Sequence, residues 1–260
     1  MTKSANYFLG EALGTFVLVF IGCSSVAISV TGIALSTLPQ VALVWWGAVT
    51  FGIWSSMKWS PAHLNPAVTL AMHSVSKFKR IDLFALLSGQ FIGALIAGLM
   101  VLLVFETSIL DYENINGIVR GKEGSYKSAI MFGEFYPNPG FEESHKVSVW
   151  KASLMEGIGV AVLMMVIITT NHIKRIKSFL QPLLIGLSIC LLIIWIAPYT
   201  QAGFNPFRDF APRIVAYFAG WREYAFPKEP LGAFYVYILS PIIASVLIMQ
   251  IHRLIYIKVD

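Results

Sequence analysis

The sequence predicts an all-α membrane protein with six transmembrane helices and two half-length helices, arranged as an inverted repeat. Three observations support this: an apolar composition, six long apolar segments, and two Asn-Pro pairs that each precede a short apolar segment. The chain of 260 residues is 57% hydrophobic and 13% charged, whereas soluble domains average about 25% charged residues. We expect one domain over residues 1–260, with repeats at roughly 1–110 and 150–260 and an extracellular connection at 106–149.

Six segments are long and apolar enough to cross a bilayer as helices, which takes about 20 residues. They lie at roughly 8–30, 39–57, 83–105, 150–170, 180–200 and 231–255. Two further apolar segments, at roughly 66–76 and 206–218, are too short to span. The sequence therefore predicts two helices that enter the bilayer without crossing it.

Each short segment begins at an Asn-Pro pair, Asn65-Pro66 or Asn205-Pro206. Proline is favoured at the first helical position, because its missing N–H would be unpaired there anyway, and asparagine is a good N-cap. Each half of the chain holds an odd number of spanning helices, so the second half enters from the opposite side. We therefore expect the two half-helices to meet near the bilayer midplane at their N-termini.

A Glu-x-x-Gly pattern recurs in the first and fourth spanning segments, at Glu11 and Glu156. An acid inside a transmembrane segment is a functional-site hypothesis by default. It could titrate in proton coupling, or it could accept backbone N–H groups from the half-helix loops and hold them in place. The symmetric placement of the two acids favours the second role.

Basic residues concentrate in the connections that share one side of the predicted bilayer. The positive-inside rule then predicts that both termini are cytoplasmic. We expect an integral protein of the plasma membrane. The net charge of +5 therefore requires no nucleic acid partner. Cys23 and Cys190 lie in apolar segments and predict neither a disulfide nor a metal site, and no cofactor is expected. The basic residues in question are Lys3, Lys58, Lys77, Lys79, Arg80, Lys174, Arg175, Lys177, Arg253 and Lys258.

Two helix N-termini that meet at the midplane make it accept oxygen lone pairs and repel cations, since each carries roughly half a positive charge. Irregular backbone at this depth is tolerated where it lines a watery cavity. These features predict a pore. The sequence holds no Gly-x-Ser-x-Gly, His-Glu-x-x-His or phosphate-loop motif, so an enzyme is not expected.

Taken together, these residues resemble the major intrinsic proteins, the aquaporins and aquaglyceroporins. The resemblance implies a homotetramer of six-helix bundles with one pore per protomer. It places Asn65, Pro66, Ala67, Asn205, Pro206 and Phe207 at the midplane, and His63, Leu64, Gly203 and Phe204 along the pore. The motifs are Glu11, His63–Val68, Gln90 with Gly93, Glu156, Pro182–Gly186, and Asn205-Pro206 with Arg208.

Four positions resemble the glycerol-conducting branch: Asp209, Arg213, the pair Pro241-Ile242, and Phe135–Asn138 in the outer connection. The resemblance implies a passive channel for glycerol and related small neutral solutes, with water passing as well. The alternatives are a water-selective channel, a proton-coupled transporter that uses Glu11 or Glu156, and a non-conducting structural protein.

The family's selectivity filter maps onto Trp45, Ile193, Ala202 and Arg208, with Trp46 as the rival for the aromatic position. This set also resembles the plant nodulin-like branch. Arg208 is always charged and offers five donors to successive hydroxyls, while a tryptophan gives an apolar wall for a carbon backbone.

Phe207 stands where the family usually has alanine in its second Asn-Pro motif. Its ring could pack sideways between helices, refilling volume lost at Ala202 and Gly203, or it could narrow the pore. The sideways arrangement is favoured, and a shut pore would suit the non-conducting alternative.

Overall fold

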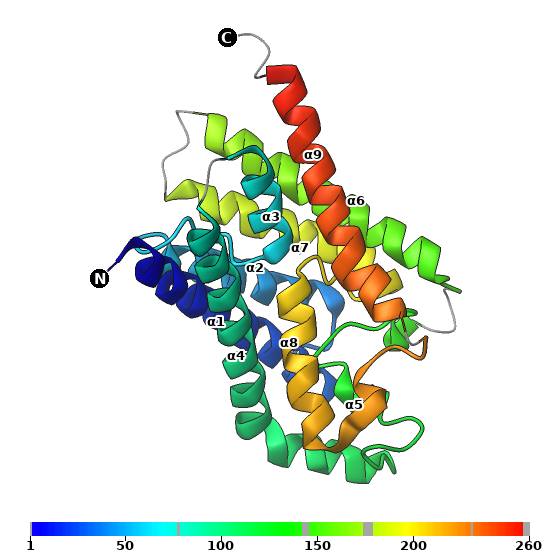
Figure 1. Cartoon of the computed structure of the whole chain (residues 1–260). Helices are drawn as coiled ribbons and strands as arrows, with labels where there is room; N and C mark the ends of the chain where they lie inside the picture. Colours follow the sequence, from blue (N-terminus) through cyan, green and yellow to red (C-terminus); the bar gives the residue numbers. More distant parts are fainter. Residues whose placement is uncertain (1, 77–78, 142–145, 174–178, 230, 257–260) are drawn as a thin grey trace.

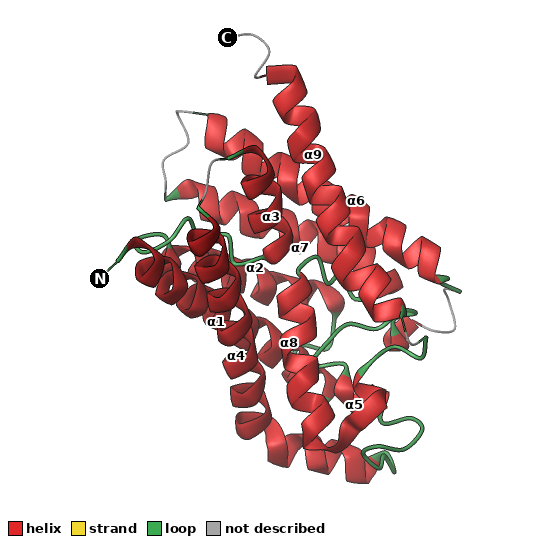
Figure 2. Cartoon of the chain, viewed as in Figure 1, coloured by secondary structure: helices red, strands yellow, loops and turns green. Residues whose placement is uncertain are grey.

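The computed structural model describes residues 2–76, 79–141, 146–173, 179–229 and 231–256. Within these ranges all regular secondary structure is helical (Figure 2). The elements are α1 (Lys3–Val30), α2 (Leu38–Ser56), α3 (Pro66–Val75), α4 (Arg80–Ile115), α5 (Tyr126–Ala129), η1 (Pro139–Phe141), α6 (Val149–His172), α7 (Leu180–Thr200), α8 (Pro206–Ala216), η2 (Tyr217–Trp221), η3 (Arg222–Ala225), η4 (Phe234–Leu239) and α9 (Ser240–Tyr256).

Five helices of the described chain are long and apolar enough to cross a membrane: α1, α4, α6, α7 and the continuous helix Phe234–Ile255 formed by η4 and α9. The 19-residue helix α2 is the sixth of spanning length. It packs between α1 and α7, and its three tryptophans lower its hydropathy. The prediction of an all-α membrane fold is confirmed.

Each half-helix packs against a spanning helix from the other half of the chain. Helix α3, from the first half, packs along α9, while α8, from the second half, packs along α4 (Figure 1). The α8–α4 contact is close, since a Cβ added at Gly98 would lie 2.8 Å from the Cα of Pro212. Helices α1 and α4 also touch at the backbone, because a Cβ at Gly93 would lie 2.2 Å from the carbonyl oxygen of Ala12.

Both half-helices begin at the predicted asparagines. The Asn65 side chain accepts a hydrogen bond from the backbone N–H of Ala67 at 2.9 Å. The Asn205 side chain accepts from the N–H groups of Phe207 and Arg208, each at 3.2 Å. A proline follows each cap at the first helical position. Local sequence alone therefore accounts for both starts.

Helix α4 continues ten residues past the predicted end of its apolar segment, from 105 to Ile115. Glu106, Asp111 and Glu113 make this extension too polar for the bilayer interior, but none of these residue types breaks a helix. The first part of the predicted 106–149 connection is therefore helical, and α5 and η1 form short helices within the remainder.

The starts of α1 and α4 lie at the same end of the bundle, where the ammonium group of Lys3 is 3.8 Å from the carboxylate of Asp82. Of the basic residues used to predict orientation, Lys77, Lys174, Arg175, Lys177 and Lys258 lie outside the described residues.

Candidate functional site

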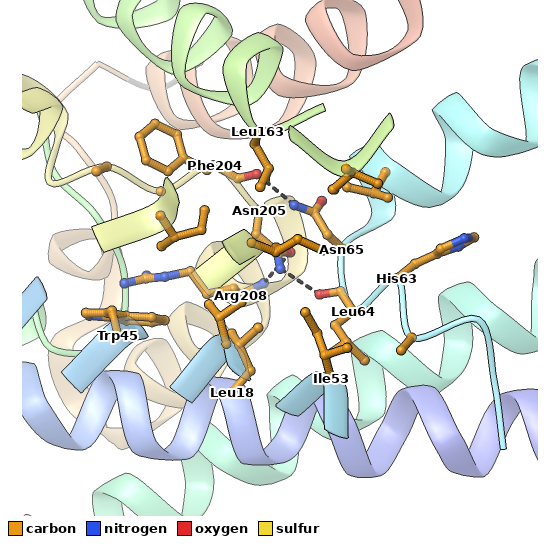
Figure 3. A pocket seen from close by; sticks show the side chains of 18 of the residues that line it. Leu18, Trp45, Ile53, His63, Leu64, Asn65, Leu163, Phe204, Asn205 and Arg208 are labelled. Carbon is orange, nitrogen blue, oxygen red and sulfur yellow. Dashed lines mark hydrogen bonds between the residues drawn. The ribbon is translucent and has the colours of Figure 1, made fainter. Parts of the chain in front are cut away.

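A cavity of about 300 Å³ runs past the point where the two half-helices meet (Figure 3). Trp45 and Arg208 lie toward one end of the view and His63 toward the other. Most of the wall is apolar. The lining residues are Leu18, Trp45, Val49, Ile53, Pro61, Ala62, His63, Leu64, Asn65, Val68, Met72, Leu163, Ile167, Asn171, Gln181, Ile185, Ile189, Ile193, Gln201, Ala202, Gly203, Phe204, Asn205 and Arg208.

The two asparagines at the meeting point bind each other's loops. Asn65 Nδ2 donates to the carbonyl oxygen of Phe204 at 2.9 Å, and Asn205 Nδ2 donates to that of Leu64 at 2.7 Å. One N–H of each amide is thus used to join the two halves of the chain. Each amide carries two donors, so one remains on each residue at the cavity wall.

Glu11 and Glu156 make equivalent contacts in the two halves. Glu11 accepts from the backbone N–H groups of His63 and Leu64 at 3.0 and 2.7 Å. Glu156 accepts from those of Gly203 and Phe204 at 2.9 and 2.7 Å. Each carboxylate also binds a hydroxyl, from Ser60 or Thr200. Both acids are fully buried, and their contacts are those of a brace for the two loops.

The loops need such a brace because their backbone is strained. Ala62 and Leu64 have φ angles of 53° and 51°, and Ala202 and Phe204 have 65° and 53°. These left-handed conformations are unfavourable for residues with a side chain and persist only where the surroundings impose them. All four residues line the cavity.

Trp45, rather than Trp46, faces the cavity. The guanidinium carbon of Arg208 lies 4.4 Å from the centroid of the Trp45 ring. Trp46 instead donates its indole N–H to the carbonyl oxygen of Leu183 in α7 at 2.9 Å, and it is absent from the lining. Ile193 and Ala202 line the same cavity, so all four residues predicted for the filter border it.

Phe207 points away from the cavity and toward α4. Its ring lies 5.5 Å from that of Phe91 in an edge-to-face contact, and it is not part of the lining. This is the sideways arrangement of the two alternatives. Ala202 lies on the cavity wall instead, so Phe207 does not refill its volume. Pro66, Ala67 and Pro206 are buried but also lie outside the lining.

Asp209 and Arg213 form an ion pair and do not line the cavity. Arg213 Nε and Nη2 donate to the two carboxylate oxygens of Asp209 at 2.9 and 2.8 Å, and Nη1 donates to the carbonyl oxygen of Ala225 at 2.6 Å. The pair therefore ties α8 to η3, which contains Ala225. Pro241 and Ile242 lie at the start of α9, outside the lining.

One charged residue beside Arg208 was missed by the sequence analysis. Glu134, which immediately precedes the Phe135–Asn138 motif, forms an ion pair between its Oε1 and Arg208 Nη2. Its backbone N–H donates to Asp209 Oδ1 at 2.7 Å. A single acid in an otherwise apolar and aromatic stretch of the outer connection was the available signal.

The chain belongs to the major intrinsic protein family, whose sequence model matches residues 1–252. The resemblance predicted from the motifs is thus confirmed. The chain is 34% identical to the glycerol uptake facilitator protein of Pseudomonas aeruginosa over 241 residues, covering 92% of this chain and 83% of the relative. It is 31% identical to the propanediol uptake facilitator PduF of Citrobacter freundii over 250 residues, covering 94% and 90%.

A solved structure supports the same assignment. The X-ray structure of the aquaglyceroporin from Plasmodium falciparum matches this fold with a TM-score of 0.79 and 25% sequence identity, covering 96% of this chain and 95% of that one.

Proposed function

We propose that this protein is a passive membrane channel that conducts glycerol and related small neutral solutes together with water, and excludes ions and protons. The observation that carries the proposal is the cavity past the two half-helix N-termini, with Arg208 and Trp45 facing each other at one end. The glycerol and propanediol uptake facilitators among the relatives support the substrate class.

The proposed selectivity filter consists of Trp45, Ile193, Ala202 and Arg208. A polyol has a hydroxyl edge and a hydrocarbon edge. This part of the cavity likewise has a hydrogen-bond donor on one side and apolar surface on the other. Arg208 donates to hydroxyl oxygens, while Trp45 and Ile193 present apolar surface. Where the half-helices meet, the remaining N–H groups of Asn65 and Asn205 donate to the hydroxyl oxygens of the solute.

Cation exclusion follows from the same groups. The positive ends of α3 and α8 both point at the cavity, and Arg208 adds a full charge. Barriers of this kind exclude protons and cations from narrow pores. Glu11 and Glu156 act as braces for the loops in this proposal, because each is already engaged by backbone N–H groups and a hydroxyl.

We further propose a homotetramer in the plasma membrane with both termini in the cytoplasm. The excess of basic residues in the predicted inner connections supports this orientation. Large apolar side chains such as Phe84, Trp150 and Phe218 are 70%, 85% and 82% exposed. Such surfaces suit lipid or neighbouring copies.

Stopped-flow light scattering on purified protein in liposomes tests the proposal, with wild type and Arg208→Ala compared for glycerol, water and cation flux. Rapid, non-saturating glycerol flux is expected, with cation leak appearing only in the variant. Water flux without glycerol flux would favour a water-selective channel. Saturable uptake driven by a pH gradient would indicate a proton-coupled transporter, and absence of all flux would refute the channel.

A further inference from the structure

Glu134 lies in the connection between α5 and η1, outside the spanning helices, yet it is 2% exposed. Its carboxylate pairs with Arg208 on the side away from the cavity, since Glu134 is not among the lining residues. The Glu134 side chain lies beside Gly203, where an added Cβ would be in ordinary contact with Glu134 Cγ at 3.5 Å. Arg208 is therefore held between the Trp45 ring and the Glu134 carboxylate.

The outer part of the cavity would be strongly positive without this carboxylate. Arg208 contributes one full charge there, and the N-termini of α3 and α8 add roughly half a charge each at the meeting point of the half-helices. The Arg208 guanidinium has only 5% of its side chain exposed, so water and salt screen it weakly. Such a site attracts small anions as readily as it repels cations.

The other nearby acids are already engaged. Asp209 binds Arg213 through both carboxylate oxygens, and Glu156 binds the N–H groups of Gly203 and Phe204. Within the described parts of the chain, Glu134 is the acid paired with Arg208. It thus supplies the negative charge that can offset the filter arginine.

We propose that Glu134 is a specificity-determining residue, the counter-charge of Arg208, and that its ionisation decides whether the outer end of the pore retains small anions. The inference rests on the proposed function, because it requires a conducting pore. When the carboxylate is charged, the site is close to neutral and passes uncharged solutes. When the carboxyl is protonated, Arg208 is left free to hold an anion that obstructs the pore.

The ionisable groups around Glu134 determine where it titrates. Burial raises the pKa of Glu134 to about 8, with Arg208 and Arg213 of α8 acting to lower it and Asp209 and Glu156 acting to raise it. Tyr237 of η4 packs beside Gly203 on the same side. The ionised fraction of Glu134 therefore increases as the pH rises through about 8, and with it the charge of the pair with Arg208.

The test measures how strongly sodium nitrate inhibits glycerol flux in liposomes, with ionic strength held constant by sodium gluconate, whose anion is too large for the pore. For wild type, we expect the inhibitory nitrate concentration to be at least tenfold higher at pH 9.5 than at pH 6.5. Glu134→Gln should show the low value at both pH values. Glu123→Gln, which changes an 83% exposed acid of the same connection, should behave as wild type.

Equal inhibition of wild type and Glu134→Gln at both pH values, in vesicles with normal glycerol flux, would overturn the inference. If Glu134→Gln does not conduct, the wild-type pH series and Glu134→Asp, which keeps the carboxylate, decide instead. A constant inhibitory concentration in both would then overturn it. Absence of glycerol flux in wild type would contradict the proposed function rather than this inference.

Discussion

The guanidinium group of Arg208 lies over the indole of Trp45, with 4.4 Å between the guanidinium carbon and the ring centroid. A contact of this kind contributes about 1 kcal/mol. The two side chains come from α8 and α2, and both line the cavity at this end.

Truncation of Trp45 should broaden selectivity. Trp45→Ala removes one wall of the proposed filter, while Arg208 keeps its ion pair with Glu134. We expect four- and five-carbon polyols to enter much faster than through wild type, measured by stopped-flow light scattering. Trp46→Phe is the matched control, because it removes the hydrogen bond to Leu183 without touching the cavity. Broadened selectivity in Trp46→Phe but not in Trp45→Ala would assign the filter position to Trp46.

Gly22→Ala should narrow the cavity at Trp45 by displacing the indole ring. A Cβ at Gly22 would lie 2.3 Å from atoms of the Trp45 indole, so the ring must move, and the space open to it is the cavity. We expect glycerol flux to fall more steeply than water flux, because glycerol is the wider solute. Gly47→Ala is the control, since its Cβ would meet only Phe51 at 4.0 Å. Unchanged glycerol flux in a folded Gly22→Ala protein would show that the Trp45 ring moves in a direction that does not narrow the cavity.

Glu156→Gln should destabilise the protein. The neutral amide has one acceptor oxygen, so one of the N–H groups of Gly203 and Phe204 loses its acceptor. A buried unsatisfied donor costs about 1–3 kcal/mol, and the strained loop is then held less firmly. A lower midpoint of thermal unfolding is expected, with residual glycerol flux that no pH gradient drives. If stability were unchanged and pH-driven accumulation were lost, Glu156 would instead be a coupling residue.

Phe207→Ala should affect stability more than conduction. The side chain is partly exposed and contacts Phe91, so we expect a loss of about 1–3 kcal/mol, below that of a fully buried ring. Glycerol permeability per folded channel should stay near wild type. Adding Ala202→Phe should lower glycerol flux without restoring stability, because residue 202 faces the cavity. A large gain in flux from Phe207→Ala would mean that the ring obstructs the pore.

Much of the architecture was predictable because it depends on short-range chemistry. The apolar segments marked the spanning helices, and the Asn-Pro pairs marked the starts of α3 and α8 through cap and first-turn preferences. The end of α4 was missed for a related reason. Hydropathy reports where the bilayer ends, whereas the helix continues through Glu106 and Asp111 to Ile115.

The sequence by itself determined the membrane class, the two half-helices and the residue types at the proposed filter. Only the tertiary structure decided that Trp45 faces the cavity, that Phe207 turns toward Phe91, and that Glu134 pairs with Arg208. Each of these depends on contacts between segments far apart in the chain. The direction in which a side chain points across a helix bundle is set by which neighbours close around it, and local sequence carries little information about that.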